Sequence, residues 1–424
     1  MQYKSIRGFS DVLPDEAAHW QRIEAASRKI FGIFGYREIR TPIIEESGLF
    51  IKSVGEETDI VKKEMFAFKD RGDRDIALRP EGTAPIIRAY LEHNLDKTEP
   101  FQKLYYIGPM FRAERPQAGR LRQFSQIGIE AIGTSESATD AEVIRLLVKL
   151  VDSIGIKGCE LKINNLGCRE DKKRLSAQLK EALSEKSVSG ALCDDCKARV
   201  GTNPLRVLDC KVESCKKIVR EKFKNSKFLC ADCDKHFDSV LKFLDLLEIK
   251  YTLDPYIVRG LDYYTRTVFE LTCSSLGAQN AIGAGGRYDN LIKDMGGADL
   301  GACGFAIGVE RAILAMAGEL PREAASGPDV FIAALGSEAY LRAFKIADEL
   351  RCAGVSCEIE HAAKSLKSQM RSADKLGARF ALIIGDDEIK KSAAVLRDMR
   401  TKEQTEINFN GIVGKIKEKA AGDA

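Results

Sequence analysis

Long apolar segments are missing from this sequence of 424 residues, which is 44% hydrophobic and 30% charged and has a single tryptophan. No window approaches the ~18 uninterrupted apolar residues that a membrane-spanning helix needs. The first residues, Met1–Gly8, also lack the apolar core of a secretory signal peptide. We therefore expect a globular protein of the cytoplasm that has no membrane partner.

Two common phosphate-binding motifs are also missing, because the sequence has neither a Walker A loop nor a Gly-x-Gly-x-x-Gly motif. The net charge of +3 is too small to indicate a partner by itself. The charge is uneven, however, since residues 197–227 hold ten Lys and Arg residues against three Asp and Glu residues. This stretch suits either a polyanion such as nucleic acid or a solvated helix face.

Twelve cysteines in a chain without an export signal indicate thiols or metal ligands rather than disulfides. Two Cys-x-x-Cys pairs, Cys193 with Cys196 and Cys230 with Cys233, are spaced like zinc ligands, although the gap between the pairs is long. Further candidate ligands nearby are Cys210, Cys215 and His236. A structural zinc ion bound by the two pairs and a set of reduced, buried cysteines both remain open interpretations.

The length suggests two or three domains. Hydrophobic periodicity predicts a helix over 15–34, a strand over 36–44, a hairpin with strands 103–110 and 123–132, and a helix over 140–153. Residues 169–250 are rich in Lys and Cys and helical in pattern. Strand-like sequence returns at 251–257, 265–272 and 304–308, so the helical stretch is interpreted as an insert in one α+β domain.

Residues 321–328 have the composition of a linker. Beyond them, predicted strands alternate with predicted helices at 330–335, 338–353, 356–360, 365–376 and 380–384. This βαβαβ order predicts a small parallel-sheet domain. We expect one α+β domain made of residues 1–168 and 251–320, a helical insertion domain of 169–250, and an α/β domain of 329–424.

The return strand of the hairpin carries an informative polar pattern. Its period of two places Gln126, Gly128 and Glu130 on one face of the sheet. A neutral amide, a gap at the glycine and a carboxylate suit a small cationic ligand. The alternative is that these residues form a solvent-exposed face of an antiparallel sheet. Arg112 stands at the end of the preceding strand, beside the polar loop of the hairpin.

A second candidate is the turn at 78–85, where Pro80 and Gly82 present Glu81 and Thr83. This pair suits an ammonium group, although turn chemistry alone also explains the residues. Residues 258–265 place an arginine and two tyrosines around a glycine, which is either a binding loop or a surface cluster.

Two glycine-containing segments complete the set. Residues 283–289 are glycine-rich enough for a ligand to approach the backbone. Residues 304–311 predict a buried strand that runs into a helix, with Arg311 in the first turn. A bound phosphate would offset this unfavourable positive charge at a helix start.

In this order and spacing the segments resemble class II aminoacyl-tRNA synthetases, specifically the histidyl-tRNA synthetase family. Motif 1 is similar to the first helix plus the strand ending at Pro42, motif 2 to Phe111-Arg112-Ala113-Glu114 with its hairpin, and motif 3 to Gly304–Arg311. Two histidine-specific signatures resemble residues 259–264 and 285–289. The resemblance covers essentially the whole chain, including the insert and the C-terminal part.

The resemblance implies an α+β fold with a class II antiparallel-sheet catalytic core, a helical insert and a C-terminal α/β anticodon-binding domain. It implies a ligase that joins L-histidine to ATP, with Mg²⁺, as an adenylate and transfers histidine to tRNA(His), working as a cytoplasmic homodimer. Its chemistry needs no zinc, so a zinc ion would be structural. The insert would clamp the tRNA acceptor stem, so deleting residues 170–245 should raise the KM for tRNA and spare adenylate formation.

The resemblance also assigns roles to individual residues. The residues implied in histidine binding are Glu81, Gly82, Thr83, Gln126, Glu130, Tyr263, Tyr264 and Tyr288. Those implied in ATP binding are Arg112, Glu114, Arg259 and Arg311, of which Arg112 and Arg259 flank the α-phosphate and act in catalysis. Those implied in contact with the tRNA acceptor end are Arg115 and Gln117.

Two alternatives share this fold. The regulatory paralogue of ATP phosphoribosyltransferase usually lacks the anticodon-binding domain and an intact ATP site. This chain keeps Arg112, Arg259 and Arg311 and has a complete C-terminal domain. The other alternative is a synthetase for threonine, proline or glycine. Glu130, Tyr263 and Tyr264 argue against it, because these amino acids have no imidazole for such side chains to bind.

Overall fold

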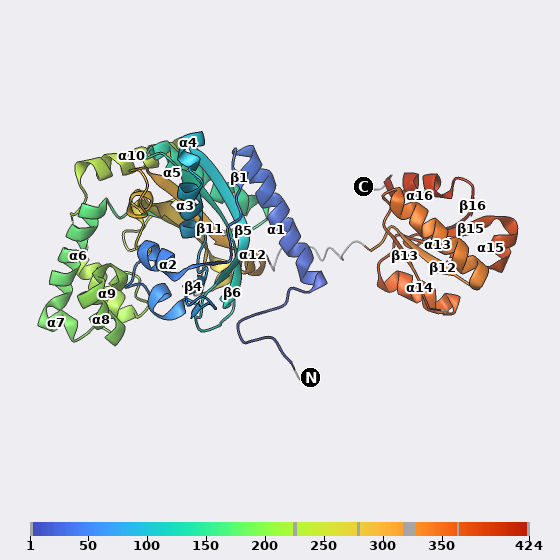
Figure 1. Ribbon diagram of the computed structural model, residues 1–424, viewed down its shortest axis with the longest axis horizontal. Helices are drawn as coiled ribbons and strands as arrows, with labels where there is room; N and C mark the ends of the chain where they lie inside the picture. The colour runs from blue at the N-terminus through green and yellow to red at the C-terminus, as the bar shows by residue number, and fades with distance from the viewer. Residues whose placement is uncertain (1–2, 224–226, 278–279, 317–326, 363, 422–424) are drawn as a thin grey trace. The chain divides into compact units, whose positions relative to one another are not determined.

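The computed structural model describes residues 3–223, 227–277, 280–316, 327–362 and 364–421 (Figure 1). The chain divides into two compact units, Met1–Glu319 and Leu320–Ala424, and each has its own hydrophobic core. Most of the linker predicted at 321–328 lies outside the described residues.

The first unit is built on an eight-stranded sheet in the order β1-β5-β6-β11-β10-β9-β7-β8. Its strands are β1 (Arg37–Glu38), β5 (Gln102–Phe111), β6 (Gln123–Ile132), β7 (Cys159–Asn165), β8 (Thr252–Leu253), β9 (Thr265–Cys273), β10 (Ala281–Arg287) and β11 (Ala302–Gly308). The inner pairs are antiparallel, and the edge pairs β1–β5 and β7–β8 are parallel. The predicted hairpin is confirmed, because β5 and β6 pair from Gln102 opposite Ile132 to Phe111 opposite Gln123.

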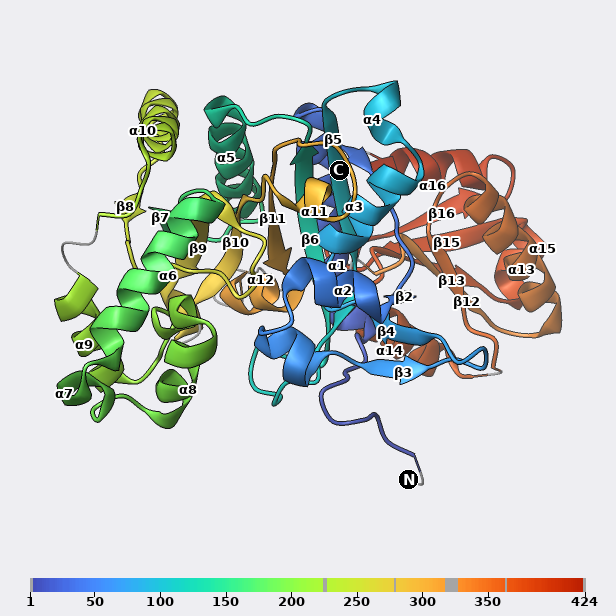
Figure 2. The same ribbon diagram turned by 60° about the vertical axis from the view of Figure 1, so that its left-hand side comes forward.

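Helices cover both faces of this sheet. They are α1 (Pro14–Ile33), α3 (Thr83–Glu92), α5 (Ser137–Ser153) and α12 (Val309–Met316). The shorter helices α2 (Ser47–Val54), α4 (Leu95–Thr98) and α11 (Leu291–Asp294) pack against α3. Helix α5 packs against α1 and against β9, β10 and β11, and α12 packs against α1, β6 and β10. Figure 2 shows α3 and α1 on opposite faces of β5 and β6. The apolar side chains of α3, among them Ile86 and Tyr90, pack with Leu104 and Tyr106 of β5.

The single strand predicted over 36–44 is wrong. The chain pairs with β5 only at β1 and then enters a small sheet of order β2-β4-β3. The strands of this sheet are β2 (Ile44–Glu46), β3 (Ala67–Lys69) and β4 (Asp75–Leu78), and a π-helical turn, Ile60–Glu64, precedes β3. Strand β1 ends at Glu38, and Pro42, which has no N–H for a ladder, lies between the two sheets. Arg79 Nη1 donates a hydrogen bond to the carbonyl oxygen of Thr41 at 3.0 Å, where the chain leaves the large sheet.

Residues 169–250 are helical, as their pattern predicts. The helices are α6 (Arg169–Ser184), α7 (Lys186–Ser189), α8 (Asp194–Thr202), α9 (Glu213–Phe223) and α10 (Ala231–Leu246), with a 3-10 turn at Pro204–Val207. Side chains of α6 to α9, including Leu175 and Val219, form a separate apolar core, whereas α10 packs against α5 and β9. The strand predicted over 251–257 is shorter than expected, because a turn from Asp254 to Ile257 ends it after β8.

The second unit contains a five-stranded sheet in the order β13-β12-β14-β15-β16. Its elements are β12 (Val330–Ala334), α13 (Ser337–Cys352), β13 (Cys357–Ile359), α14 (Leu366–Lys375), β14 (Phe380–Ile384), α15 (Asp386–Lys391), β15 (Ala393–Asp398), β16 (Gln404–Asn408) and α16 (Ile412–Ala421). Strand β12 runs parallel to β13 and β14, which confirms the predicted βαβαβ order, and the antiparallel β15 and β16 were not predicted. No helix among the described residues is long and apolar enough to span a bilayer.

Candidate active site

Glu130 of β6 is the buried centre of a polar network and is only 1% exposed. Thr83 Oγ1 donates a hydrogen bond to Glu130 Oε1 at 2.7 Å, and the Tyr288 hydroxyl donates to Oε2. Gly304 faces Glu130 on β11, and a Cβ atom at that position would lie 2.0 Å from Oε2, so the glycine makes room for the carboxylate. Burial raises the pKa of Glu130 to about 8, against the opposing effect of these two hydrogen bonds.

Glu81 caps the start of α3. Its Oε2 accepts the backbone N–H of Thr83 at 2.7 Å, and its Oε1 accepts that of Ala84 at 2.8 Å. The positive end of the helix favours the carboxylate, whereas burial raises the pKa of Glu81. The Tyr263 hydroxyl lies 3.4 Å from Oε2. Thr83 therefore links two buried carboxylates, Glu81 through its N–H and Glu130 through its hydroxyl.

Three tyrosines surround these carboxylates. The ring centroids of Tyr263 and Tyr264 are 4.7 Å apart, and Tyr263 meets Tyr288 edge-on at 5.6 Å. Burial raises the pKa of all three hydroxyls, that of Tyr264 to about 12, so they remain neutral phenols. The structure thus brings together side chains from α3, β6, the loop before β9 and the end of β10.

The gap expected next to Gly128 is filled. Tyr106 stands directly opposite Gly128 on β5, and a Cβ atom on Gly128 would lie 2.5 Å from the Tyr106 ring. A Cβ atom on Gly82 would lie 2.4 Å from the same ring, so both positions need glycine to leave room for the Tyr106 side chain. Gln126 lies on the same sheet face as Glu130, and its Oε1 is buried and accepts no hydrogen bond from any described residue. This oxygen is an acceptor that a ligand N–H group would satisfy.

Small side chains continue this face of the sheet across three strands. The register places Gly128 beside Ala306, Ala306 beside Ala284, and Ala284 beside Glu270 of β9. Strands lie about 4.8 Å apart, so Gly128 and Glu270 are separated by roughly 14 Å. Ala284 and Ala306 are part-exposed, while the alternate residues point into the core on the other face. We call Ala284, Ala306, Gly304 and Gly308 the small-residue floor.

Two arginines stand at edges of this floor. Arg259 Nη1 donates a hydrogen bond to Glu270 Oε2 at 2.8 Å, and the buried Arg259 Nε has no partner among the described residues. Arg112 Nε donates to the carbonyl oxygen of Pro80 at 2.9 Å, and its guanidinium carbon lies 5.2 Å from the ring centroid of Phe124. Each guanidinium is therefore oriented by one hydrogen bond and keeps N–H groups that can bind an anion.

Arg311 lies in the first turn of α12, as predicted. Its Nη1 donates to the carbonyl oxygen of Ala281 at 2.5 Å and its Nε to that of Gly119 at 3.3 Å. Burial lowers the pKa of Arg311, which makes an anionic partner favourable there. The neighbouring Glu310, which the sequence did not single out, accepts the backbone N–H of Ser125 at 2.8 Å, and burial raises its pKa to about 7.

The loop of the hairpin is more open. Glu114 forms an ion pair with Arg120 at 3.1 Å, and Gln117 and Arg120 are joined by two backbone hydrogen bonds. The side chains of Arg115 and Gln117 are exposed. The loop therefore presents these two side chains to solvent rather than to the buried carboxylates.

Helix α6 supports the loop that carries Tyr263 and Tyr264. Lys172 Nζ donates hydrogen bonds to the carbonyl oxygens of Asp262 at 2.7 Å and Tyr264 at 2.9 Å. Burial lowers the pKa of Lys172, opposed by the nearby Asp262 carboxylate. Sequence reasoning missed this lysine because the two partners lie about 90 residues away and the contact depends on tertiary structure.

The segment between α8 and α9 supports the same loop. Asn203 Nδ2 donates to Asp262 Oδ1 at 3.2 Å, and Arg206 Nη1 donates to the carbonyl oxygen of Arg259 at 3.4 Å. Removal of residues 170–245 would delete these contacts together with Lys172. We therefore expect such a deletion to impair adenylate formation as well, contrary to the expectation from the sequence.

Arg287, within the glycine-rich segment, has a structural role. It is fully buried, and its Nε donates to Asp140 Oδ1 of α5 at 2.9 Å and its Nη1 to Asp289 Oδ1 at 2.9 Å. Asp140 also lies 3.0 Å from the Nε2 atom of His236 on α10. This buried network joins β10 to α5 and α10 on the face opposite the floor.

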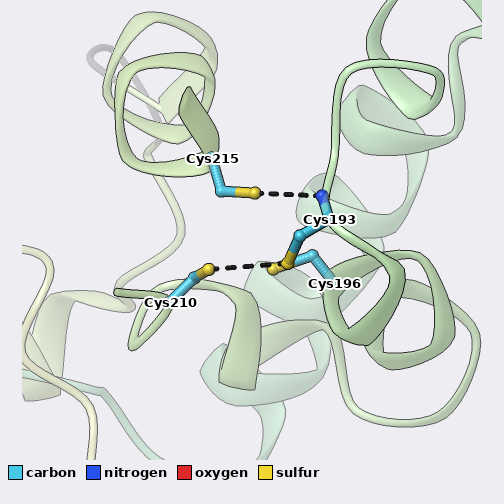
Figure 3. Close-up of side chains that lie close together, drawn as sticks. All are labelled: Cys193, Cys196, Cys210 and Cys215. Carbon is cyan, nitrogen blue, oxygen red and sulfur yellow. Dashed lines mark hydrogen bonds between the residues drawn. The ribbon is translucent and has the colours of Figure 1, made fainter. Parts of the chain in front are cut away.

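The two Cys-x-x-Cys pairs do not meet, so the zinc set expected from Cys193, Cys196, Cys230 and Cys233 is wrong. Cys193 and Cys196 instead lie with Cys210 and Cys215 (Figure 3). The second pair, Cys230 and Cys233, gathers with Cys168 and Asp171 near the start of α6. Sequence spacing could not choose between these groupings, because each pair sits at the start of a different helix.

Comparison with known proteins gives one consistent result. Residues 8–312 match the family model described as histidyl-tRNA synthetase, and residues 329–419 match the anticodon binding domain. A histidine–tRNA ligase of Thermosipho melanesiensis is 48% identical over 98% of this chain and 99% of its own length. One from Geobacter metallireducens is 48% identical over 97% and 99%. The crystal structure of apo histidyl-tRNA synthetase from S. aureus superposes with a TM-score of 0.80 at 35% identity, covering 98% of this chain and 100% of the other. This chain belongs to the histidyl-tRNA synthetase family.

Proposed function

We propose that this protein is a histidine–tRNA ligase, which joins histidine to ATP as histidyl-adenylate and then transfers the histidyl group to tRNA(His). The observation that carries the assignment is the arrangement of the candidate site. Two buried carboxylates and their tyrosines lie at one end of the small-residue floor, and Arg259 is hydrogen-bonded to Glu270, which lies three strands across the sheet from Gly128. A histidyl group bound at the first end would direct its carboxylate toward the arginines.

Histidine recognition follows from the hydrogen-bonding capacity of the pocket. We propose that Glu130 and Tyr264 bind the two imidazole nitrogens, since a neutral imidazole offers one donor and one acceptor. The α-ammonium group would be bound by Gln126 Oε1, Thr83 Oγ1 and Glu81. Gln126 supports this role because its buried Oε1 has no partner among the described residues. Tyr263, Tyr288 and Gly82 shape the pocket through their contacts with the carboxylates and with Tyr106.

The first chemical step needs charge stabilisation rather than a protein nucleophile. The histidine carboxylate attacks the α-phosphorus of ATP, a new P–O bond forms, and the bond to the leaving pyrophosphate breaks. We propose that Arg112 and Arg259 bind the α-phosphate oxygens on which negative charge develops, and that Arg311 binds the terminal phosphate. Glu114 belongs to the same site near Arg112. Mg²⁺ bound with ATP would neutralise phosphate charge.

Transfer to tRNA would use surfaces around the site. We propose that Arg115 and Gln117 contact the acceptor end, that residues 329–424 bind the anticodon, and that 169–250 act as an insertion domain that contacts the acceptor stem. The basic stretch supports the last role, because its Lys211, Lys217, Arg220 and Lys222 side chains are exposed.

Replacing Lys211 and Lys217 by glutamate is expected to raise the KM for tRNA about tenfold, because like charge would face the phosphate backbone. The two substitutions leave the contacts of Lys172, Asn203 and Arg206 intact, so ATP–pyrophosphate exchange without tRNA should keep its wild-type rate. Steady-state aminoacylation and exchange assays measure the two quantities separately.

The matched control reverses two exposed lysines outside the basic stretch, Lys149 on α5 and Lys242 on α10. This variant has the same net charge as the test variant. An equal rise in the KM for tRNA in both variants would contradict a specific contact by the basic stretch of residues 197–227.

We propose that the protein acts in the cytoplasm as a homodimer that buries the elements of motif 1. Large apolar side chains around these elements are exposed, among them Leu13 at 62% and Ile33 at 73%. Ile44 and Phe68 of the small sheet are also exposed. Sedimentation equilibrium should give twice the chain mass, and a monomer at micromolar concentration would contradict the proposal.

The regulatory paralogue of ATP phosphoribosyltransferase is not favoured. The matches span the chain, the C-terminal unit matches an anticodon-binding domain, and Arg112, Arg259 and Arg311 all border the floor. Aminoacylation of tRNA(His) with labelled histidine tests the proposed function directly. Labelled tRNA is expected, and adenylate formation without transfer would restrict the function to the first step.

A further inference from the structure

Four cysteine sulfurs meet inside the apolar core of the helical insert. Cys193 precedes α8, Cys196 lies in its first turn, Cys210 follows the 3-10 turn and Cys215 lies in the first turn of α9 (Figure 3). Cys193 is half-buried and the other three are buried. All four Sγ atoms lie within 4.8 Å of one another.

The spacing of the sulfurs matches a tetrahedral metal site better than a disulfide. Zinc–sulfur bonds of about 2.3 Å in a tetrahedron place neighbouring sulfurs roughly 3.8 Å apart. The Sγ atoms of Cys193 and Cys210 are 3.8 Å apart. A disulfide needs an S–S distance of about 2.05 Å, and all four cysteines are free thiols in this structure. No pair of sulfurs needs to close by more than about 1 Å to reach the tetrahedral distance.

Backbone donors and nearby charges also favour thiolates at this position. The N–H of Cys193 donates to Cys215 Sγ at 3.2 Å, and the N–H of Val212 donates to Cys210 Sγ at 3.4 Å. Such donors orient thiolate ligands and reduce the cost of their charge. Four thiolates and a zinc ion carry a net charge of about −2, and Cys210 and Cys215 lie in the stretch 197–227, which holds ten Lys and Arg residues against three Asp and Glu residues.

The second cysteine group differs in its chemistry. Asp171 accepts the N–H groups of Cys168 at 3.2 Å and Cys230 at 3.1 Å and forms an ion pair with Arg174. Its carboxylate oxygens are therefore used to cap α6 and to hold the start of α10. This group, which includes Cys233, is explained as a capping network without a metal.

We propose that Cys193, Cys196, Cys210 and Cys215 bind one zinc ion as an all-thiolate structural site. The ion joins α8 to α9 across the segment that carries Asn203 and Arg206. Because these two residues contact the loop of Arg259 to Asp262, the zinc site also stiffens the support of the candidate active site. The proposal rests on the sulfur geometry and does not depend on the proposed function.

The test is elemental analysis of the full chain purified under reducing conditions without chelator. About one zinc ion per chain is expected in the wild-type protein, and Cys196→Ser and Cys215→Ser should each reduce this content several-fold. The matched control is Cys233→Ser, which removes a buried thiol of the second group and should keep the zinc. A protein that carries no zinc and takes up none when it is added, one that carries iron instead, or zinc loss in Cys233→Ser but not in Cys196→Ser, would overturn the proposal.

A second measurement avoids variants that fail to fold. Wild-type protein in which cobalt replaces zinc should show the intense visible bands of tetrahedral cobalt with thiolate ligands. Chelation should abolish these bands and increase the number of thiols that react with a thiol reagent. Weak bands typical of octahedral oxygen ligands, or equal thiol reactivity before and after chelation, would contradict the all-thiolate site.

Discussion

Replacing Arg259 by alanine is expected to lower the rate constant of adenylate formation by about 10²–10³-fold, because the variant loses a fixed donor to the α-phosphate. Arg259→Lys should recover only part of this loss, since a lysine cannot bind two oxygens at once in the guanidinium geometry. The KM for histidine should change little, because Arg259 lies at the opposite end of the floor from Glu130. Single-turnover formation of adenylate measures the rate constant directly.

Glu270→Gln is the matched control for this prediction. It preserves Arg259 but weakens the 2.8 Å hydrogen bond that orients it, so a loss of only a few-fold is expected. If Arg259→Ala retained a rate constant within threefold of the wild-type value, Arg259 would have no catalytic role and the arginine end of the site would need another assignment.

Replacing Glu130 by glutamine is expected to raise the KM for histidine about 10²-fold or more, because the amide has one acceptor oxygen in place of the two carboxyl oxygens and cannot become a carboxylate beside the imidazole. The two side chains have nearly the same shape, and the hydroxyl groups of Thr83 and Tyr288 can bond to either, so the fold should survive. Steady-state ATP–pyrophosphate exchange at varied histidine concentration measures this change. Thr83→Ser, which keeps the hydroxyl that bonds to Glu130, is the mild control.

The same substitution should also remove a loss of stability that the wild-type protein undergoes as pH rises from 5 to 8. The pKa of Glu130 rises from its usual value of 4.5 to about 8 in the fold, so between these values the folded state holds a proton that the unfolded state has released. The free energy of unfolding therefore falls as pH rises through this window. Glutamine has no proton to lose, so the Tm of Glu130→Gln relative to wild type should increase from pH 5 to pH 8. A Tm difference independent of pH would contradict the raised pKa.

Local patterns in the sequence were sufficient to predict much of the fold. Alternating side chains indicated β5 and β6, and helical periodicity indicated α1, α5 and α13. The strand expected over 36–44, ending around Pro42, was wrong because the chain leaves β5 after Glu38 and enters the small sheet, which depends on tertiary pairing and not on local periodicity. Strand β16 was missed because it is a largely exposed edge strand with a polar sequence. This reason does not apply to β15, which is mostly buried between β14 and β16.

The candidate site was predictable where residues act through motifs and not where they act through packing. Glu81, Thr83 and Glu130 were named from their segments, and the structure joins them. Tyr106 was missed because its role depends on Gly128 across the hairpin and on Gly82 from another segment. The cysteine partners could not be assigned for the same reason, because ligand identity depends on how α8 and α9 pack.

The most direct test of the central claim is amino-acid-dependent ATP–pyrophosphate exchange, measured with each of the twenty amino acids, Mg²⁺ and no tRNA. A pocket that binds both imidazole nitrogens should reject the other amino acids by roughly 10⁴-fold, so exchange is expected with histidine alone. Exchange with a different amino acid would keep the adenylation chemistry and contradict the assignment of Glu130 and Tyr264. The absence of exchange from folded protein would contradict the enzymatic function and favour the regulatory paralogue.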